Sequence, residues 1–115
     1  MEVFDRSLAL KRLGGDEARL DLLIDVYLKS VPGTMEVLEM NAEKQLAEPL
    51  KQEAEVLRVS SQQIGAEGME DLAAQMSEAA ETADFEKIQT LITHMGMEFD
   101  WLSRILDQNR CSGNL

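Results

Sequence analysis

The segment "AEVLRVSSQQIGA" (54–66) places charged and polar side chains at helical spacing. Arg58, Val59 and Gln62 follow Glu55 by three, four and seven residues, which puts all four side chains on one side of a helix. Glu55 and Arg58 can form an ion pair there, worth about 0.3 kcal/mol. An apolar Val59 among polar neighbours is typical of an interface. We interpret this side as a partner-binding surface, and a merely solvated helix face is the alternative.

The single histidine, His94, is the other residue that could carry chemistry. It lies in "LITHMGMEFDW", where Glu98 follows four residues later and could orient the imidazole by a hydrogen bond. An imidazole held in this way could accept a phosphoryl group. His94 also adjoins the apolar stripe of its segment. We therefore predict a partly buried structural histidine, and keep a phosphorylation site as the alternative.

Other catalytic or ligand-binding patterns are missing from the sequence. The single cysteine, Cys111, can form no internal disulfide and stands in no metal-ligand spacing. There is no glycine-rich phosphate loop, no Glu-x-x-His motif, and no second histidine for a metal site or a catalytic triad. The sequence therefore predicts neither a metal nor a cofactor.

The acidic composition restricts the possible partners. The chain of 115 residues contains 22 acidic and 11 basic residues and has a net charge of −11. Such a surface repels nucleic acid and anionic membranes. The sequence lacks both an apolar run of the roughly 20 residues that a membrane span needs and a signal-peptide pattern. We predict a single cytoplasmic domain that binds neither nucleic acid nor membrane.

Capping residues mark the starts of the expected helices. Asp5, Asp16 and Asp84 each precede a segment of helical periodicity and are suitable N-caps. Pro49 fits the first turn of another helix, where its missing N–H matters least. Together with the segment "MEDLAAQMSEAAE", these signals predict a short first helix followed by four longer ones.

Glycines and apolar spacing indicate where these helices end and which sides they bury. The first helix stops at Gly14–Gly15 and the third helix, which begins near Pro49, stops at Gly65. Pro32 interrupts the second segment without shifting its apolar stripe, which indicates one bent helix, with two helices as the alternative. The stripe of the last segment shows the helical spacing most clearly: Phe85, Ile88, Ile92, Met95, Phe99, Leu102 and Leu106.

Amphipathic helices with short connections predict an all-α fold. We expect an antiparallel four-helix bundle over residues 1–108, with the short additional N-terminal helix covering one end. Residues 109–115 are expected to form a flexible C-terminal tail.

Two long stretches, "VFDRSLALKRLGGDEARLDLLIDVYLKSVPGTMEVL" and "AEVLRVSSQQIGAEGMEDLAAQMSEAA", resemble the histidine-containing phosphotransfer (HPt) domain family. The resemblance extends from about Val3 to Leu106, and "FD…L…GGD" and "LRVSSQQIGA" are its more specific parts. It implies a helical bundle of the kind that passes phosphoryl groups between receiver domains in phosphorelays. It further implies that the side containing residue 55 docks a receiver domain.

The central motif of the family reads Ala-His-x-Leu-Lys-Gly, followed by a polar run and by Leu or Ile before Gly-Ala. Five positions match it: Ala54, Leu57, Ile64, Gly65 and Ala66. The phosphorylated histidine, however, falls at Glu55, the basic residue at Arg58 and the glycine at Val59. A glutamate is a weak nucleophile with the wrong charge to approach a phosphoryl group. Val59 puts a branched side chain where the family leaves room.

These departures lead to a specific prediction. The chain is expected to be a non-catalytic HPt-like module that docks a receiver domain of a response regulator or hybrid sensor kinase, or else a kinase domain, and accepts no phosphate. A sharper hypothesis is that Glu55 permanently imitates a phosphohistidine. The alternatives are an active phosphotransfer protein that uses His94, and a self-associating bundle, although we favour a monomer over a homodimer.

Overall fold

The computed structural model describes residues 4–110, with side chains described for residues 4–107. Five helices make up this part of the chain: α1 (Arg6–Arg12), α2 (Glu17–Glu43), α3 (Ala47–Gln63), α4 (Glu67–Glu81) and α5 (Phe85–Arg110). Residues 4–110 contain no strand. The prediction of an all-α fold is therefore confirmed.

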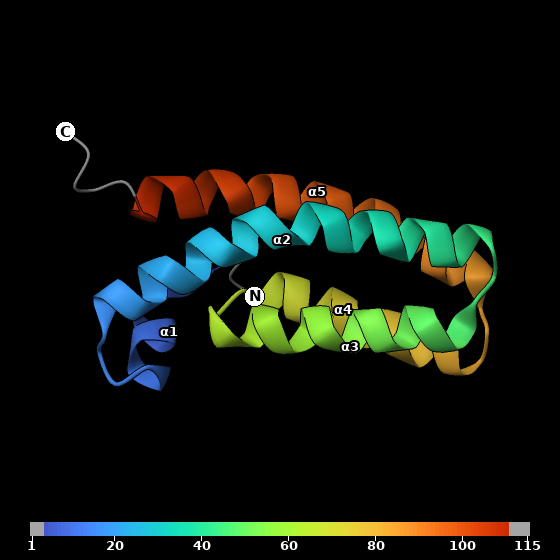
Figure 1. Cartoon of the computed structure of the whole chain (residues 1–115), viewed down its shortest axis with the longest axis horizontal. Coiled ribbons are helices and arrows are strands. Elements are labelled where there is room, and N and C mark those ends of the chain that lie inside the picture. Colours follow the sequence, from blue (N-terminus) through green and yellow to red (C-terminus); the bar gives the residue numbers. More distant parts are fainter. Residues whose placement is uncertain (1–3, 111–115) are drawn as a thin grey trace.

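The four long helices form an antiparallel bundle (Figure 1). α2 packs against α3 and α5, and α4 packs against the same two helices. One layer of the bundle thus consists of α2 and α5 and the other of α3 and α4, so that α3 and α5 stand at opposite corners. The short helix α1 lies at one end of the bundle, beside the start of α2 (Figure 1). This is the predicted architecture.

Three aspartates cap the helices as predicted. The Asp5 carboxylate accepts a hydrogen bond from the backbone N–H of Leu8 at 3.0 Å, at the start of α1. Asp16 and Asp84 accept corresponding bonds at the starts of α2 and α5, at 3.0 and 3.1 Å. Each cap satisfies a backbone donor that the helix itself leaves unpaired, which stabilises the fold by about 1 kcal/mol.

Gly65 joins the end of α3 to the start of the chain. Its φ of 76° lies in the left-handed region that favours glycine. A Cβ atom at this position would lie only 2.9 Å from the backbone oxygen of Asp5 and 3.2 Å from Cβ of Ala9. The Asp5 N–H also donates to the Gly65 oxygen at 3.3 Å. The Ile-Gly-Ala motif therefore lets α1 pack closely against the end of α3.

The helix boundaries differ from the expected ones in details. α2 is a single helix with Pro32 inside it, and its ribbon changes direction near the middle in Figure 1, as predicted. α4 begins at Glu67, two residues before the expected segment. α5 ends at Arg110 and so includes the first two residues of the predicted tail, 109–115. The rest of that segment, including Cys111, lies outside the described residues.

The core runs the length of the bundle and includes the predicted apolar stripe of α5. On α5, five stripe residues are buried and the two phenylalanines, Phe85 and Phe99, are partly buried. The largest fully buried side chains are Leu20, Ile24, Leu38, Leu50, Leu57, Ile64, Met69, Met76, Ile88, Met95, Leu102 and Leu106. Among the helices of residues 4–110, none has the length and apolar character that a bilayer span requires.

Candidate partner-binding site

The four predicted site residues lie together on the outer side of α3. The side chains of Glu55 and Arg58 are 43% and 33% exposed. Val59 is 43% exposed, and Gln62 is exposed one turn further along. Apolar positions on the opposite side of the helix, such as Leu57, are buried in the core. α3 therefore presents these residues to solvent, where a partner could reach them.

Glu55 and Arg58 form the expected ion pair. Nε of Arg58 donates to both carboxylate oxygens of Glu55, at 3.2 and 3.4 Å, and Nη2 donates to Oε1 at 3.2 Å. This guanidinium is the main cause that lowers the pKa of Glu55, and the Ser77 hydroxyl of α4 also favours the charged form. Glu55 is therefore ionised at neutral pH and its charge is compensated locally.

Val56 extends the apolar part of this surface, which the sequence interpretation missed. It is 61% exposed, more than Val59 three residues later. Both valines are β-branched, and β-branched residues have a low helix propensity. Helix formation therefore does not explain why they stand here. The signal that singled out Val59, an apolar side chain among polar neighbours, applies equally to Val56. Here the name α3 face denotes Glu55, Val56, Arg58, Val59 and Gln62.

Carboxylates of α4 surround the other side of Arg58. A hollow of about 330 Å³ next to Arg58 is lined by Glu67, Glu70 and Asp71 of α4. Within the described part of the chain, no three acidic, histidine or cysteine side chains are grouped so that they could hold a metal ion. These charges create a negative potential beside Glu55, and this potential opposes the approach of a phosphoryl group.

A buried hydrogen bond fixes the position of α3 against α2. The hydroxyls of Tyr27 and Ser61 lie 2.7 Å apart, and both residues are buried. Burial raises the pKa of Tyr27 far above its ordinary value. At the end of α3, Nη1 of Arg12 donates to the backbone oxygen of Gln62 at 2.8 Å. Contacts from α1 and α2 thus set the orientation in which the α3 face points outward.

His94 is exposed on α5, so the prediction of a partly buried structural histidine is wrong. It follows the buried Ile92 and precedes the buried Met95, but a step of 100° per residue turns its side chain off the core stripe. Within residues 4–107 no hydrogen bond joins it to Glu98, whose carboxylate instead lies over Gly68 of α4. α5 stands at the corner opposite α3, so the fold does not bring His94 and the α3 face together.

The geometry of this bundle matches a solved phosphotransfer protein. The chain superimposes on the crystal structure of histidine-containing phosphotransfer protein B (HptB) from Pseudomonas aeruginosa with a TM-score of 0.86 and 18% sequence identity, covering 94% of each chain. No protein-family model and no curated protein matches the sequence. At this identity the likeness establishes the fold. The chain has the fold of a histidine-containing phosphotransfer protein, as the resemblance in its sequence predicted.

Proposed function

We propose that this chain is a non-catalytic HPt-like binding module of two-component signalling. In this proposal the α3 face docks a receiver domain, from a response regulator or a hybrid sensor kinase, and no phosphoryl group is accepted. The proposal places the chain in the cytoplasm with its partner. The observation that carries it is Glu55, which stands where the family motif has its histidine and is held by Arg58 at 3.2 Å.

Three features of the site argue against phosphate transfer. A carboxylate is a poor nucleophile, and its acyl phosphate would need a bound cation and an acidic pocket built around it. Arg58, the basic residue of the motif, is already engaged by Glu55. The carboxylates of α4 add negative charge on its other side. A phosphoryl group would therefore enter a site in which the described residues offer no free cation to stabilise it.

The same face has the anatomy of a modest protein interface. Val56 and Val59 supply an apolar centre, and Glu55, Arg58 and Gln62 form a polar rim around it. Partner interfaces combine an apolar centre with a polar rim in this way. Because α3 is held from behind by the Tyr27–Ser61 bond, the face is presented on a rigid element.

The test is a direct binding measurement. Receiver-containing proteins captured from the source organism by the wild-type chain would be purified and titrated by calorimetry against wild type, Val59→Asp and Glu55→Arg. We expect both variants to weaken binding at least tenfold. Trp101→Asp on α5 is the control for the valine, since Trp101 is 55% exposed at the far corner, and Glu78→Arg on α4 is the control for the charge. Unchanged affinity in the two α3 variants would refute the proposal.

The exposure of His94 favours one alternative function, active phosphotransfer through α5. This alternative is distinguished from the proposed function by incubating the chain with a receiver domain that carries radioactive phosphate. We expect no label on the wild type. Label that appears on the wild type and disappears in His94→Ala would establish this alternative instead. The remaining alternative is a dimer formed through the α3 face. Light scattering at several concentrations tests it, and we expect the chain to be a monomer.

A further inference from the structure

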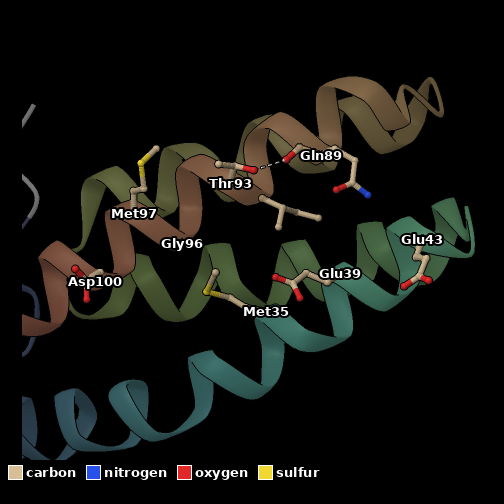
Figure 2. A pocket seen from close by; sticks show the side chains of 9 residues that line it. Met35, Glu39, Glu43, Gln89, Thr93, Gly96, Met97 and Asp100 are labelled. Carbon is tan, nitrogen blue, oxygen red and sulfur yellow. Dashed lines mark hydrogen bonds between the residues drawn. The ribbon is translucent and has the colours of Figure 1, made fainter.

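A second surface hollow lies on the other layer of the bundle, between α2 and α5 (Figure 2). It is a groove of about 670 Å³ with two walls, one formed by residues of α2 and the other by residues of α5. Its lining residues are Met35, Glu39, Glu43, Gln89, Ile92, Thr93, Gly96, Met97 and Asp100. On α2 the lining positions recur every four residues, and on α5 they recur every three or four. Both walls therefore run parallel to the helix axes, as expected of a groove that binds an elongated ligand.

The floor of the groove is apolar and adaptable. Met35 of α2 reaches toward Gly96 of α5 (Figure 2). Ile92 and Met97 are the other apolar residues of the lining, Ile92 buried beneath the groove and Met97 exposed at its edge. A Cβ atom on Gly96 would meet the Met35 methyl carbon at 3.7 Å, an ordinary contact, so packing between the two helices does not require glycine. A glycine inside a helix is unfavourable, yet here it keeps the groove open. Methionines suit such a surface because their flexible side chains adjust to different apolar partners.

The walls of the groove carry uncompensated negative charge. Glu39 and Glu43 stand one turn apart on α2, and neither has an ion-pair partner among the described side chains. Like charges at this spacing repel one another. Asp100, on the facing wall, is paired with Arg104 at 2.9 Å. Cations placed along the α2 wall would relieve this repulsion, whereas an acidic ligand would increase it.

We infer that this groove docks an amphipathic helix of a partner protein that carries lysine or arginine along one edge of its apolar side. The apolar floor would bury the hydrophobic stripe of that helix, and Glu39 and Glu43 would pair with its basic edge. Two copies of this chain do not fit groove to groove, because that pairing would bring the same carboxylates against Glu39 and Glu43. Since α3 lies in the other layer, the α3 face stays free, and the module can hold two partners at once.

The inference is tested with a defined probe, which makes the result independent of any receiver domain. The probe is a fluorescent 18-residue peptide of leucine and lysine patterned as an amphipathic helix, with a scrambled peptide of the same composition beside it. Anisotropy should show saturable binding of the patterned peptide only. Glu39→Lys with Glu43→Lys should weaken that binding about tenfold. Gly96→Leu, which leaves every charge in place and fills the groove, should weaken it at least as much.

A matched control separates docking from general attraction to an acidic protein. Glu48→Lys with Glu78→Lys changes the net charge by the same amount on α3 and α4, at two exposed positions that do not line the groove. This control should lower affinity no more than twofold, and circular dichroism should show all variants folded. Equal losses in the two double variants, equal binding of the patterned and scrambled peptides, or an unaffected Gly96→Leu would each overturn the inference.

Discussion

The hydrogen bond between Tyr27 and Ser61 should be among the most costly single contacts to break in this protein. The two hydroxyls lie 2.7 Å apart, and the residues are 2% and 0% exposed. A buried polar group that loses its partner keeps the full cost of its removal from water, about 1–3 kcal/mol. The bond also sets the rotation of α3 relative to α2, and thereby the direction of the α3 face.

The two single substitutions should have unequal effects. Ser61→Ala leaves the Tyr27 hydroxyl buried without a partner and should cost about 2 kcal/mol, slightly reduced by the better helix propensity of alanine. Tyr27→Phe should cost only about 1 kcal/mol, because a serine hydroxyl in a helix can turn to a carbonyl of the preceding turn. The double variant should resemble Tyr27→Phe alone. The coupling energy between the two sites would then be about 1–2 kcal/mol.

Urea denaturation followed by circular dichroism measures these differences. With a slope of about 1.5 kcal/mol per molar urea, Ser61→Ala should lower the midpoint by about 1 M. Receiver binding measured on the same variants would report whether the orientation of the α3 face changes as well. The reasoning is refuted if the two single losses simply add, with a coupling energy below about 0.4 kcal/mol.

The structure predicts three other results. Because burial raises the pKa of Tyr27, the folded chain keeps that proton when the unfolded chain begins to lose it near pH ~10. The free energy of unfolding should therefore fall above that pH, by up to ~1.4 kcal/mol per pH unit for this group. Urea unfolding of Tyr27→Phe at several pH values should lack the part of this pH dependence that the Tyr27 hydroxyl contributes. Gly65→Ala should cost about 2 kcal/mol, seen as a melting temperature lower by about 10 °C, because it forces a side chain into a left-handed backbone and against Asp5. Glu55→His combined with Val59→Gly should make the chain accept acid-labile phosphate from a labelled receiver domain that leaves the wild type unlabelled.

The fold could be predicted because its signals are local. Asp5, Asp16 and Asp84 each cap the helix that follows them, and this needs only a short side chain beside the free N–H groups of the first turn. The stripe of α5 follows from a period that every helix shares. The sequence also indicated that a helix ends at Gly65, but it did not show why a glycine is needed there. The close approach of Asp5 and Ala9 joins residues from the two ends of a long stretch of sequence.

Whether a side chain at the edge of an apolar stripe is exposed depends on how the neighbouring helices pack, which the sequence does not show. His94 lies one residue from the buried Met95, and only the packing of α5 between α2 and α4 decides that its imidazole faces solvent. Val56 was missed for a related reason, since α3 buries a narrow stripe and leaves a wide outer side. The groove between α2 and α5 had no signal in the sequence. Glu39 and Gly96 are far apart along the chain, and each by itself is an ordinary surface residue.

The ion pair on α3 also bears on whether Glu55 imitates a phosphohistidine. A phosphoryl group would carry a charge of about −1.5 to −2 at neutral pH. Glu55 carries a single charge, and the Arg58 guanidinium contacts both of its oxygens. A partner that meets this surface therefore finds a nearly neutral pair beside Val56 and Val59, and not a free anion. Burying the exposed parts of the two valines would contribute roughly 2 kcal/mol, about a thirtyfold change in affinity. Loss of a valine should thus weaken docking more than neutralisation of Glu55 does, which favours recognition by apolar contact over imitation of a phosphate.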